Sequence, residues 1–251
     1  MRLAGRAALV TGGSRGIGRA IAERLARDGA DVAITVHREP GEATLEAIRA
    51  AGVRALALAA DLADADAPGG AVAAAHAAFG RLDILVNNAG GTRIAPLLET
   101  SAEQWDRVFA LNVRGPFLAL QAAARLMVAQ GRGAIVNIAS VAAHGPRPTV
   151  PAYAAAKAAL ISVTRSAAAA LAPHGIRVNT ISPGLIETST WERLRAEAAG
   201  QAMFEERLAG IAMRRAGTPE EIADAVAYLV SDEAGYVTGQ DWNVCGGLEM
   251  R

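Results

Sequence analysis

Short apolar runs typical of β-strands alternate along this chain with longer stretches rich in Ala, Leu and Arg, which are typical of helices. The strand segments are apolar on both faces, as in a parallel sheet that helices cover on both sides. Predicted strands lie at 7–11, 31–36, 54–60, 83–88, 134–140, 176–182 and 241–245, and predicted helices at 16–28, 41–51, 66–79, 101–129, 152–172 and 219–231. The alternation predicts an α/β fold, a doubly wound parallel seven-stranded sheet with helices on both faces.

Composition limits the possible classes of function. The chain has 251 residues and no linker or repeat that divides it, so residues 1–251 are expected to form a single domain. Lys plus Arg and Asp plus Glu number 25 each, and a net charge of +0 argues against nucleic acid or an anionic membrane as partner. No apolar run exceeds six residues, so no membrane span is expected.

Cysteine and histidine usage points to the cytoplasm and away from metal chemistry. Cys245 is the one cysteine, which suits a reducing compartment. The histidines are scattered without the spacing of metal ligands, so no metal site is expected. The apolar stretch at the N-terminus is too short for a signal peptide, and we expect a cytoplasmic protein.

A glycine-rich loop follows the first predicted strand and leads directly into a helix. It reads TGGSRGIG (11–18), with glycines at 12, 16 and 18. Glycines there allow a tight turn and a close approach to a pyrophosphate, which the free N–H groups of the helix N-terminus can bind. An ordinary glycine turn is the alternative, but the strand-loop-helix context favours dinucleotide binding and a Rossmann fold.

A phenol and an ammonium group share one face of an alanine-rich predicted helix. Tyr153 and Lys157 stand four residues apart in PAYAAAKAAL (151–160), so their side chains can interact. A half-exposed Tyr beside a Lys that extends to solvent is the simpler interpretation. The other is an acid whose pKa is tuned for catalysis.

Three polar features lie at or near the predicted carboxyl edge of the sheet, where ligands bind in such folds. The run NNAG (87–90) follows the fourth strand, and Ser140 ends the fifth. Asn112 stands inside a predicted helix, where Asn is unfavourable because its side chain competes for backbone hydrogen bonds. An Asn-rich turn, a strand-end hydroxyl and a surface Asn remain alternatives.

Six motifs in one order resemble the short-chain dehydrogenase/reductase family, and in particular its 3-oxoacyl-carrier-protein reductase-like branch. They are Gly12-x3-Gly16-x-Gly18, NNAG, Asn112, Ser140, Tyr153-x3-Lys157 and SPGLIET (182–188), and the ending SDEAGYVTGQDWNVCGG (231–247) is also similar. The resemblance covers essentially the whole chain. It implies an oxidoreductase that interconverts a carbonyl and a secondary alcohol.

The resemblance also implies a role for each catalytic residue. Tyr153 would give a proton to the carbonyl oxygen, or accept one in reverse. Lys157, together with an oxidised nicotinamide, would lower its pKa from about 10. Ser140 would hold the substrate oxygen, and Asn112 would position a water that reaches Lys157.

The implied cofactor is NADP(H) rather than NAD(H). An NAD-selective site has a carboxylate at the end of the second strand, where this chain has Val36. Arg38 and Arg15 would instead bind a 2′-phosphate through charge-assisted hydrogen bonds, although Glu39 is a competing partner for Arg38. Asp61 would meet the adenine, and Ile186 and Thr188 the carboxamide. The full predicted set is Gly12, Ser14, Arg15, Gly16, Ile17, Gly18, His37, Arg38, Asp61, Leu62, Asn88, Ala89, Gly90, Tyr153, Lys157, Pro183, Gly184, Ile186 and Thr188.

The sequence constrains the substrate less than it constrains the cofactor. Residues 185–217 are expected to form a lid, with Arg93, His144 and Trp191 as candidate pocket residues. Carrier-protein reductases tend to show a basic pair where this chain has His174 and a displaced Arg132, which favours a free ketone, aldehyde or hydroxy compound. A 3-oxoacyl-carrier-protein reductase, an isomerase or epimerase of the same fold, and a non-catalytic nucleotide-sensing protein remain alternatives.

Assembly is the last expectation. The predicted helices at 101–129 and 152–172 are apolar around more of their circumference than a solvated helix should be. In the family such helices pair across a two-fold axis, and the C-terminal segment makes a second contact. We therefore expect a homotetramer, with a dimer as the fallback, although burial within one subunit explains one face of each helix.

Overall fold

The computed structural model describes residues 1–91 and 94–250, and its centre is one parallel sheet. Its strands follow the spatial order β3-β2-β1-β4-β5-β6-β7, so the predicted doubly wound seven-stranded sheet is confirmed. The strands are β1 (Ala7–Val10), β2 (Asp31–Val36), β3 (Ala55–Ala59), β4 (Ile84–Asn87), β5 (Gly133–Ile138), β6 (Ile176–Pro183) and β7 (Asp241–Val244).

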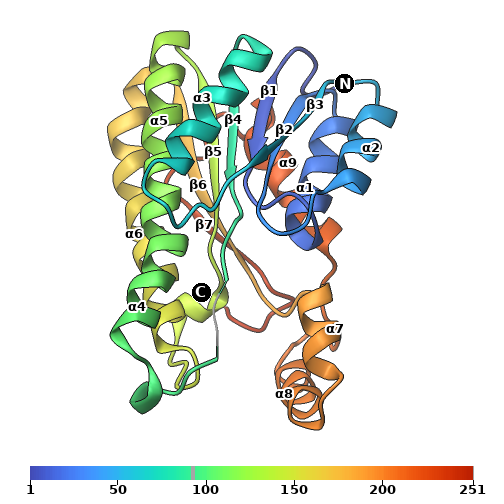
Figure 1. The fold of residues 1–251 in the computed structure, drawn as a ribbon, viewed down its shortest axis with the longest axis vertical. Helices are drawn as coiled ribbons and strands as arrows, with labels where there is room; N and C mark the ends of the chain where they lie inside the picture. The colour runs from blue at the N-terminus through green and yellow to red at the C-terminus, as the bar shows by residue number, and fades with distance from the viewer. Residues whose placement is uncertain (92–93, 251) are drawn as a thin grey trace.

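Helices cover both faces of this sheet (Figure 1). The helices are α1 (Gly16–Arg27), α2 (Glu42–Ala50), α3 (Ala67–Phe79), α4 (Ala102–Phe109), α5 (Gly115–Gln130), α6 (Pro151–Leu171), α7 (Ser189–Arg195), α8 (Ala198–Ala209) and α9 (Pro219–Val230). One core lies between the sheet and α1, α2 and α9, and the other between the sheet and α3, α5 and α6. This division explains why the strands are apolar on both faces.

The register places the carboxyl ends of the central strands at one edge. Val10 pairs with Ile34 of β2 and with Val86 of β4, and Val86 pairs in turn with Val136 of β5. The loops that follow these strands therefore open in the same direction, as ligand-binding loops do in doubly wound sheets. Beyond this edge lie α4 on one side and α7 and α8 on the other (Figure 1).

The helix predicted at 101–129 is helical throughout, but it is divided into α4 and α5 by a π-helical turn at Ala110–Arg114 that was not predicted. Asn112 lies in that turn, and its Nδ2 donates to the carbonyl oxygens of Val108 and Gly91, both at 2.9 Å. The side chain thus satisfies the Val108 carbonyl, which an unbroken helix would pair with a backbone N–H, and it also ties the turn to Gly91. π turns often mark functional positions.

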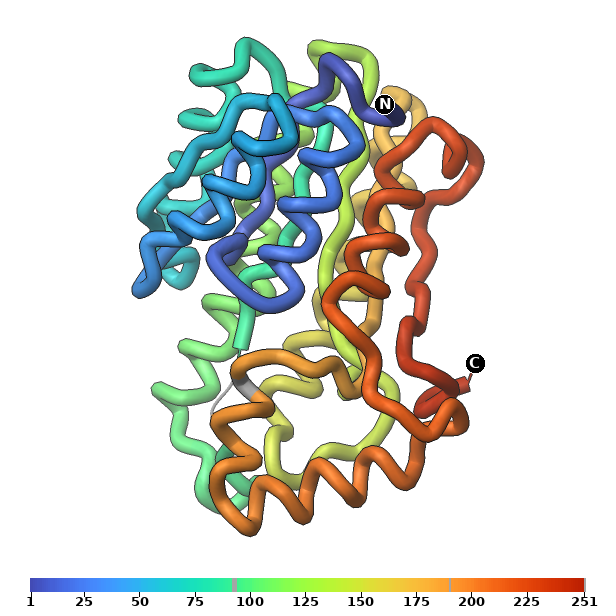
Figure 2. Tube along the Cα trace, turned by 90° about the vertical axis from the view of Figure 1, so that its right-hand side faces the viewer, coloured from blue at the N-terminus to red at the C-terminus, as the bar shows by residue number. Residues whose placement is uncertain are grey.

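The lid predicted at 185–217 contains α7 and α8 and has a small apolar core of its own. Leu185, Phe204 and Ile211 are buried in it, and the Trp191 ring meets the Phe204 ring edge-on at 5.5 Å between centroids. An isolated parallel bridge between Ile186 and Gly217 joins the two ends of the segment. Figure 2 shows the lid, in orange, crossing the open end of the molecule.

Among the residues that the structure describes, one segment, Pro151–His174, is long and apolar enough to cross a membrane by length and composition, with a mean hydropathy of 1.2. Core helices of soluble proteins meet the same criterion. In this fold the segment is α6 with its following turn. Its buried residues include Lys157 and Thr164, and Thr164 bonds to Asn137 of β5 at 2.8 Å.

Candidate active site

Tyr153, Lys157 and Ser140 meet at the carboxyl edge of the sheet. Tyr153 and Lys157 occupy the first two turns of α6, and the Lys157 Nζ lies 5.6 Å from the centre of the Tyr153 ring. The same Nζ donates to the carbonyl oxygen of Ile138 at 2.8 Å, which fixes the ammonium group against the end of β5. Ser140 follows that strand; its hydroxyl accepts from the Ala142 N–H at 3.1 Å and is close enough to the Tyr153 phenol to affect its pKa.

Burial raises the pKa of the Tyr153 phenol, whereas the Ser140 hydrogen bond and the positive charge of Arg207 lower it. The expected lowering by Lys157 is not among these effects, so the charge that favours the phenolate here comes from the lid. Burial also lowers the pKa of Lys157 to about 8. The ammonium group is therefore mostly protonated at neutral pH but titrates within reach of it.

Asn112 and Lys157 converge on Gly90. A Cβ atom at Gly90 would lie 2.7 Å from the Asn112 Oδ1 and 3.2 Å from the Lys157 Nζ. The Asn112 Oδ1 also accepts from the backbone N–H of Gly91 at 3.2 Å. A side chain at position 90 would therefore separate the two polar groups that the sequence predicted to work together.

The glycine loop forms an open cradle at the N-terminus of α1. Gly12 and Gly16 have φ values of 64° and 53°, which favour glycine, and a Cβ at Gly18 would collide with the carbonyl oxygen of Gly12. Arg15, at the N-cap, makes no side-chain capping bond, so the first N–H groups of the helix are left for a ligand. This donor set fits the pyrophosphate of a dinucleotide.

Asn88, directly after β4, hydrogen-bonds to the glycine loop. Its Nδ2 donates to the carbonyl oxygens of Thr11 and Gly12 at 2.9 and 3.1 Å, and the Thr11 hydroxyl accepts from the N–H groups of Asn88 and Ala89, both at 2.9 Å. The predicted residues Asn88 and Ala89 are thus tied to the predicted glycine loop, although 76 positions separate Gly12 from Asn88.

The cations beside the predicted ribose site differ from expectation in their pairing. Glu39 forms its ion pair with Arg15, at 3.1 Å, and not with Arg38. Arg38 is exposed just beyond β2, next to exposed His37. Asp61 accepts from the Ala63 N–H at 3.1 Å and pairs with Arg107 at 3.0 Å, and these contacts keep the pKa of its carboxyl low.

The remaining predicted cofactor residues lie around the glycine loop, at the start of the lid or in the core beneath them. A Cβ at Gly16 would lie 3.6 Å from the Thr188 Cγ2, so Thr188, the N-cap of α7, stands over the loop. Pro183 ends β6, Gly184 packs against Cys245, and Ile186 forms the bridge to Gly217. Ser14 contacts α2 through its carbonyl oxygen, Leu62 is buried after β3, and Ile17 packs on the core beneath α1.

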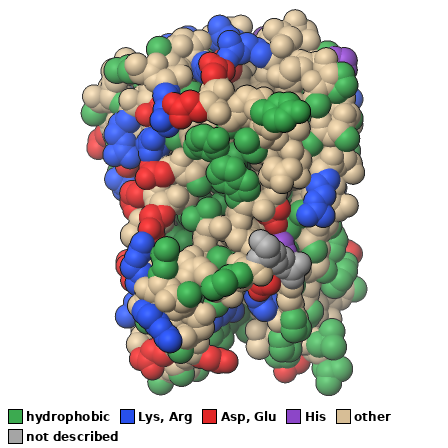
Figure 3. Space-filling view, turned by 180° about the vertical axis from the view of Figure 1, so that it is seen from behind, with side chains coloured by type: hydrophobic (Ala, Val, Ile, Leu, Met, Phe, Trp, Pro, Cys, Tyr) green, Lys and Arg blue, Asp and Glu red, His purple; other side chains and the backbone are tan. Residues whose placement is uncertain are grey.

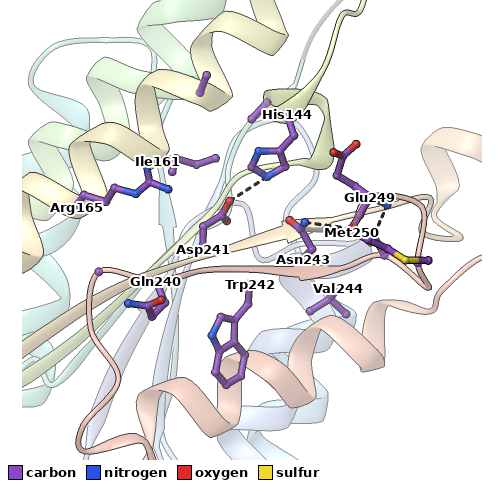
Figure 4. Close-up of a pocket in the computed structure, with 15 residues that line it drawn as sticks. His144, Ile161, Arg165, Gln240, Asp241, Trp242, Asn243, Val244, Glu249 and Met250 are labelled. Atoms are coloured by element: carbon purple, nitrogen blue, oxygen red, sulfur yellow. Dashed lines mark hydrogen bonds and ion pairs between the residues drawn. The ribbon is translucent and has the colours of Figure 1, made fainter.

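The three candidate pocket residues do not lie together. Arg93 lies outside the described residues. Trp191 belongs to the lid, where the Arg207 guanidinium lies 5.3 Å from its ring centre. His144 turns instead toward β7, and its Nε2 lies 3.0 Å from the Asp241 Oδ2 in a separate pocket (Figure 4).

Sequence reasoning missed Arg207. The charge of this α8 residue acts on Tyr153, which lies 54 positions earlier in the chain. Its only signal was a cation within the irregular lid segment, and that segment carries several other arginines.

Comparisons with known proteins agree with this geometry. A family profile described as enoyl-(acyl carrier protein) reductase matches residues 12–249. The chain is 42% identical to a 3-oxoacyl-[acyl-carrier-protein] reductase of Staphylococcus aureus, covering 98% of both chains, and 41% identical to a sorbitol dehydrogenase of Cereibacter sphaeroides, covering 100% of both. A solved short-chain dehydrogenase from Burkholderia cenocepacia in complex with NADP superposes with a TM-score of 0.90, at 40% identity over 99% of each chain.

Proposed function

Because this chain belongs to the short-chain dehydrogenase/reductase family, we propose that Tyr153 is the general acid and base of its reaction. The protein is an NADP(H)-dependent oxidoreductase that interconverts a carbonyl and a secondary alcohol. The observation that supports the assignment is the convergence of the Tyr153 phenol, the Ser140 hydroxyl and the Lys157 ammonium at one edge of the sheet. When bound, the nicotinamide supplies or accepts the hydride.

In this proposal Ser140 and Lys157 assist the proton transfer by Tyr153. The Ser140 hydroxyl hydrogen-bonds the substrate oxygen and keeps it beside the phenol, so that the proton moves over one short contact. In reduction Tyr153 gives its proton to that oxygen, and in oxidation it removes the alcohol proton. Lys157 returns a proton to the phenolate through water held near Asn112 and Gly90. Its pKa of about 8 suits that exchange near neutral pH.

The cradle of residues 12–18 binds the pyrophosphate in this proposal, and Thr188 and Ile186 hold the carboxamide. Arg38 and Arg15 lie on the side of the 2′-phosphate, and Asp61 faces the adenine. The uncapped N-terminus of α1 supports the pyrophosphate site. The position of Thr188 over Gly16 supports the carboxamide contact.

A free ketone, aldehyde or hydroxy compound is the proposed substrate class. The Arg132 guanidinium, near one position of the basic pair of carrier-protein reductases, lies 3.5 Å from an Asp232 carboxylate oxygen, and His174 stands at the other position. The 42% identity to the Staphylococcus reductase favours a second candidate, a 3-oxoacyl group on a carrier protein. Comparing the rates on 3-oxobutanoyl groups carried by acyl carrier protein with those on free ketones separates the two.

We also propose that the protein is a homotetramer in the cytoplasm.

The test of the catalytic assignment is Tyr153→Phe. Turnover on a panel of ketones and aldehydes with NADPH should fall by about 10² to 10⁴, because only the acidic proton is lost. NADPH binding, measured by fluorescence, should persist. Tyr228→Phe is a matched control, since that ring stacks on Trp242 at 5.5 Å, outside the site. A Tyr153→Phe protein that retains a large fraction of the wild-type rate would show that another group moves the proton. Wild-type NADPH binding without turnover of any carbonyl would favour the nucleotide-sensing alternative.

A further inference from the structure

A short helical turn begins at Ser140, and its far end contacts the edge of the sheet. Ser140 is the N-cap of this 3₁₀ turn, η3 (Val141–His144), and His144 is its last residue. The His144 ring points toward β7, where its Nε2 lies 3.0 Å from the Asp241 Oδ2 (Figure 4). The two side chains are only 10% and 8% exposed, so water competes little for this contact.

The Asp241 carboxylate is held from its other side as well. Its Oδ1 accepts from the Ser182 hydroxyl of β6 at 2.7 Å. The backbones of β6 and β7 already pair along the whole of β7, so the carboxylate is not needed to join the two strands. Because Ser182 fixes one carboxylate oxygen, the other oxygen is directed at the His144 ring.

A buried imidazole–carboxylate pair contributes direction more than stability. A buried carboxylate loses its hydration, and the contacts that replace the water compensate for that loss only in good geometry. Such a contact restricts both a distance and an angle, which apolar packing does not. The pair therefore fixes the position of η3 more narrowly than the burial of Val141 and Ala142 alone.

The Ser140 side chain is bonded to this same turn. Its hydroxyl accepts from the Ala142 N–H at 3.1 Å, and its carbonyl oxygen accepts from the Ala143 N–H at 3.0 Å. Because η3 is only four residues long, a displacement at His144 reaches the serine through these two bonds. A shift of the turn would therefore move the Ser140 hydroxyl relative to the Tyr153 phenol.

We propose, resting on the assignment of Tyr153 as acid and base, that His144 and Asp241 are positioning residues for the Ser140 hydroxyl. Both side chains act through Ser140 and not on the reacting atoms. Asp241, oriented by Ser182, holds the His144 ring and so keeps η3 where the Ser140 hydroxyl can hydrogen-bond the substrate oxygen. A misplacement of about 1 Å in a group that orients the substrate can lower a rate by about 10².

Replacement of His144 tests the positioning. In His144→Leu, kcat for a ketone that the wild type reduces with NADPH should fall by about 10-fold or more, while the KM for NADPH stays the same. In His144→Gln the amide nitrogen stands as many bonds from Cα as the imidazole Nε2, so it can still hydrogen-bond Asp241 and should recover much of the rate. Gln130→Leu is the matched control. It removes two hydrogen bonds to Leu82, at 2.8 and 3.1 Å, at the other end of the sheet and should leave kcat unchanged.

A double-mutant cycle separates positioning from a general loss of stability. If His144 acts through Ser140, His144→Leu should add almost nothing to the loss of kcat in Ser140→Ala, because the group that it positions is already absent. Asp241→Asn should show the same dependence. A residue that merely stabilises the fold would lower kcat by the same factor in both backgrounds. Urea denaturation shows whether each variant is folded under the assay conditions.

Hydrogen–deuterium exchange gives a readout that needs no substrate. The Ala142 and Ala143 amides, in the peptide 139–150, should exchange faster in His144→Leu than in the wild type and in Gln130→Leu. Three results would overturn the proposal. They are an unchanged kcat in His144→Leu, a full additional loss on top of Ser140→Ala, and unchanged exchange in this peptide. If the wild type reduces no carbonyl, the proposed function fails separately, and the exchange still decides whether the pair fixes the turn.

Discussion

Arg15 and Arg38 stand beside the same predicted phosphate site but in different electrostatic states. Glu39 is paired with Arg15 at 3.1 Å, so part of that charge is already compensated. Arg38 is exposed and, among the described residues, has no ion pair. The arginine that has no carboxylate partner gains more from a phosphate dianion, so Arg38 should carry most of the preference for NADP(H).

We predict that Arg38→Ala lowers kcat/KM for NADPH by about 10- to 100-fold, the range of a charge-assisted contact, and barely changes the value for NADH. Arg15→Ala should cost less, and Glu39→Gln should strengthen NADPH binding by freeing Arg15. Steady-state kinetics with both cofactors measure these changes. A larger loss in Arg15→Ala than in Arg38→Ala would assign the phosphate to the glycine loop instead.

Lys157 makes stability depend on pH in the alkaline range. Its pKa falls from 10.5 in the unfolded chain to about 8 in the fold, so between these values the unfolded state binds more protons. Stability from this group therefore rises with pH between 8 and 10.5. Relative to Lys157→Met, the wild type should gain about 2 kcal/mol in the free energy of unfolding between pH 8 and pH 10, measured by urea denaturation. Parallel curves for the two proteins would show that Lys157 titrates normally.

Among the elements, the sequence predicted those strands and helices that follow from the periodicity of apolar residues. The strands, α1, α2, α3, α6 and α9 follow from apolar runs and glycine boundaries, and the capping box at Thr218 and Glu221 starts α9 as its residues indicate. The π turn could not be predicted from periodicity, because the segment is apolar around much of its circumference and a change of phase leaves no clear mark in such a pattern. Asn112 was the one local signal of it.

The position of the lid was less predictable for a different reason. Nothing in the segment 185–217 fixes the angle at which α7 and α8 leave the sheet, because that angle depends on contacts such as the Ile186–Gly217 bridge. Most motif residues could be placed, since they end a strand or start a helix. Arg207 has no such position, and its approach to Tyr153 emerges only in three dimensions.

For the whole molecule, an apolar groove between α5 and α6 is the feature relevant to assembly. It has a volume of about 580 Å³ and is lined by Phe117, Leu120, Val128, Val163 and Leu171 among others. Phe117 and Val128 are 42% and 39% exposed there. Figure 3 shows hydrophobic side chains at the surface of the face opposite to the view of Figure 1. An exposed apolar groove on α5 and α6 fits a contact with a second copy of the chain.

We predict that Phe117→Glu reduces the proposed tetramer to dimers, because the carboxylate would be buried without a partner if the α5–α6 contact formed. Leu98→Glu is the control, since Leu98 is 97% exposed and lies outside the groove. Light scattering coupled to size-exclusion chromatography measures the mass of each protein. An active wild-type monomer at micromolar concentration would contradict the prediction.

The bridge between Ile186 and Gly217 also bears on how such an enzyme can diverge. Both ends of the lid leave the rest of the fold at one point, where the Gly217 N–H donates to Leu185 and the Glu187 N–H donates to Gly217, both at 2.9 Å. Insertions or replacements between these ends leave the strands and the start of α6 where they are. Mutations confined to the lid can therefore change the substrate that the enzyme accepts, while the residues that transfer the proton stay where they are.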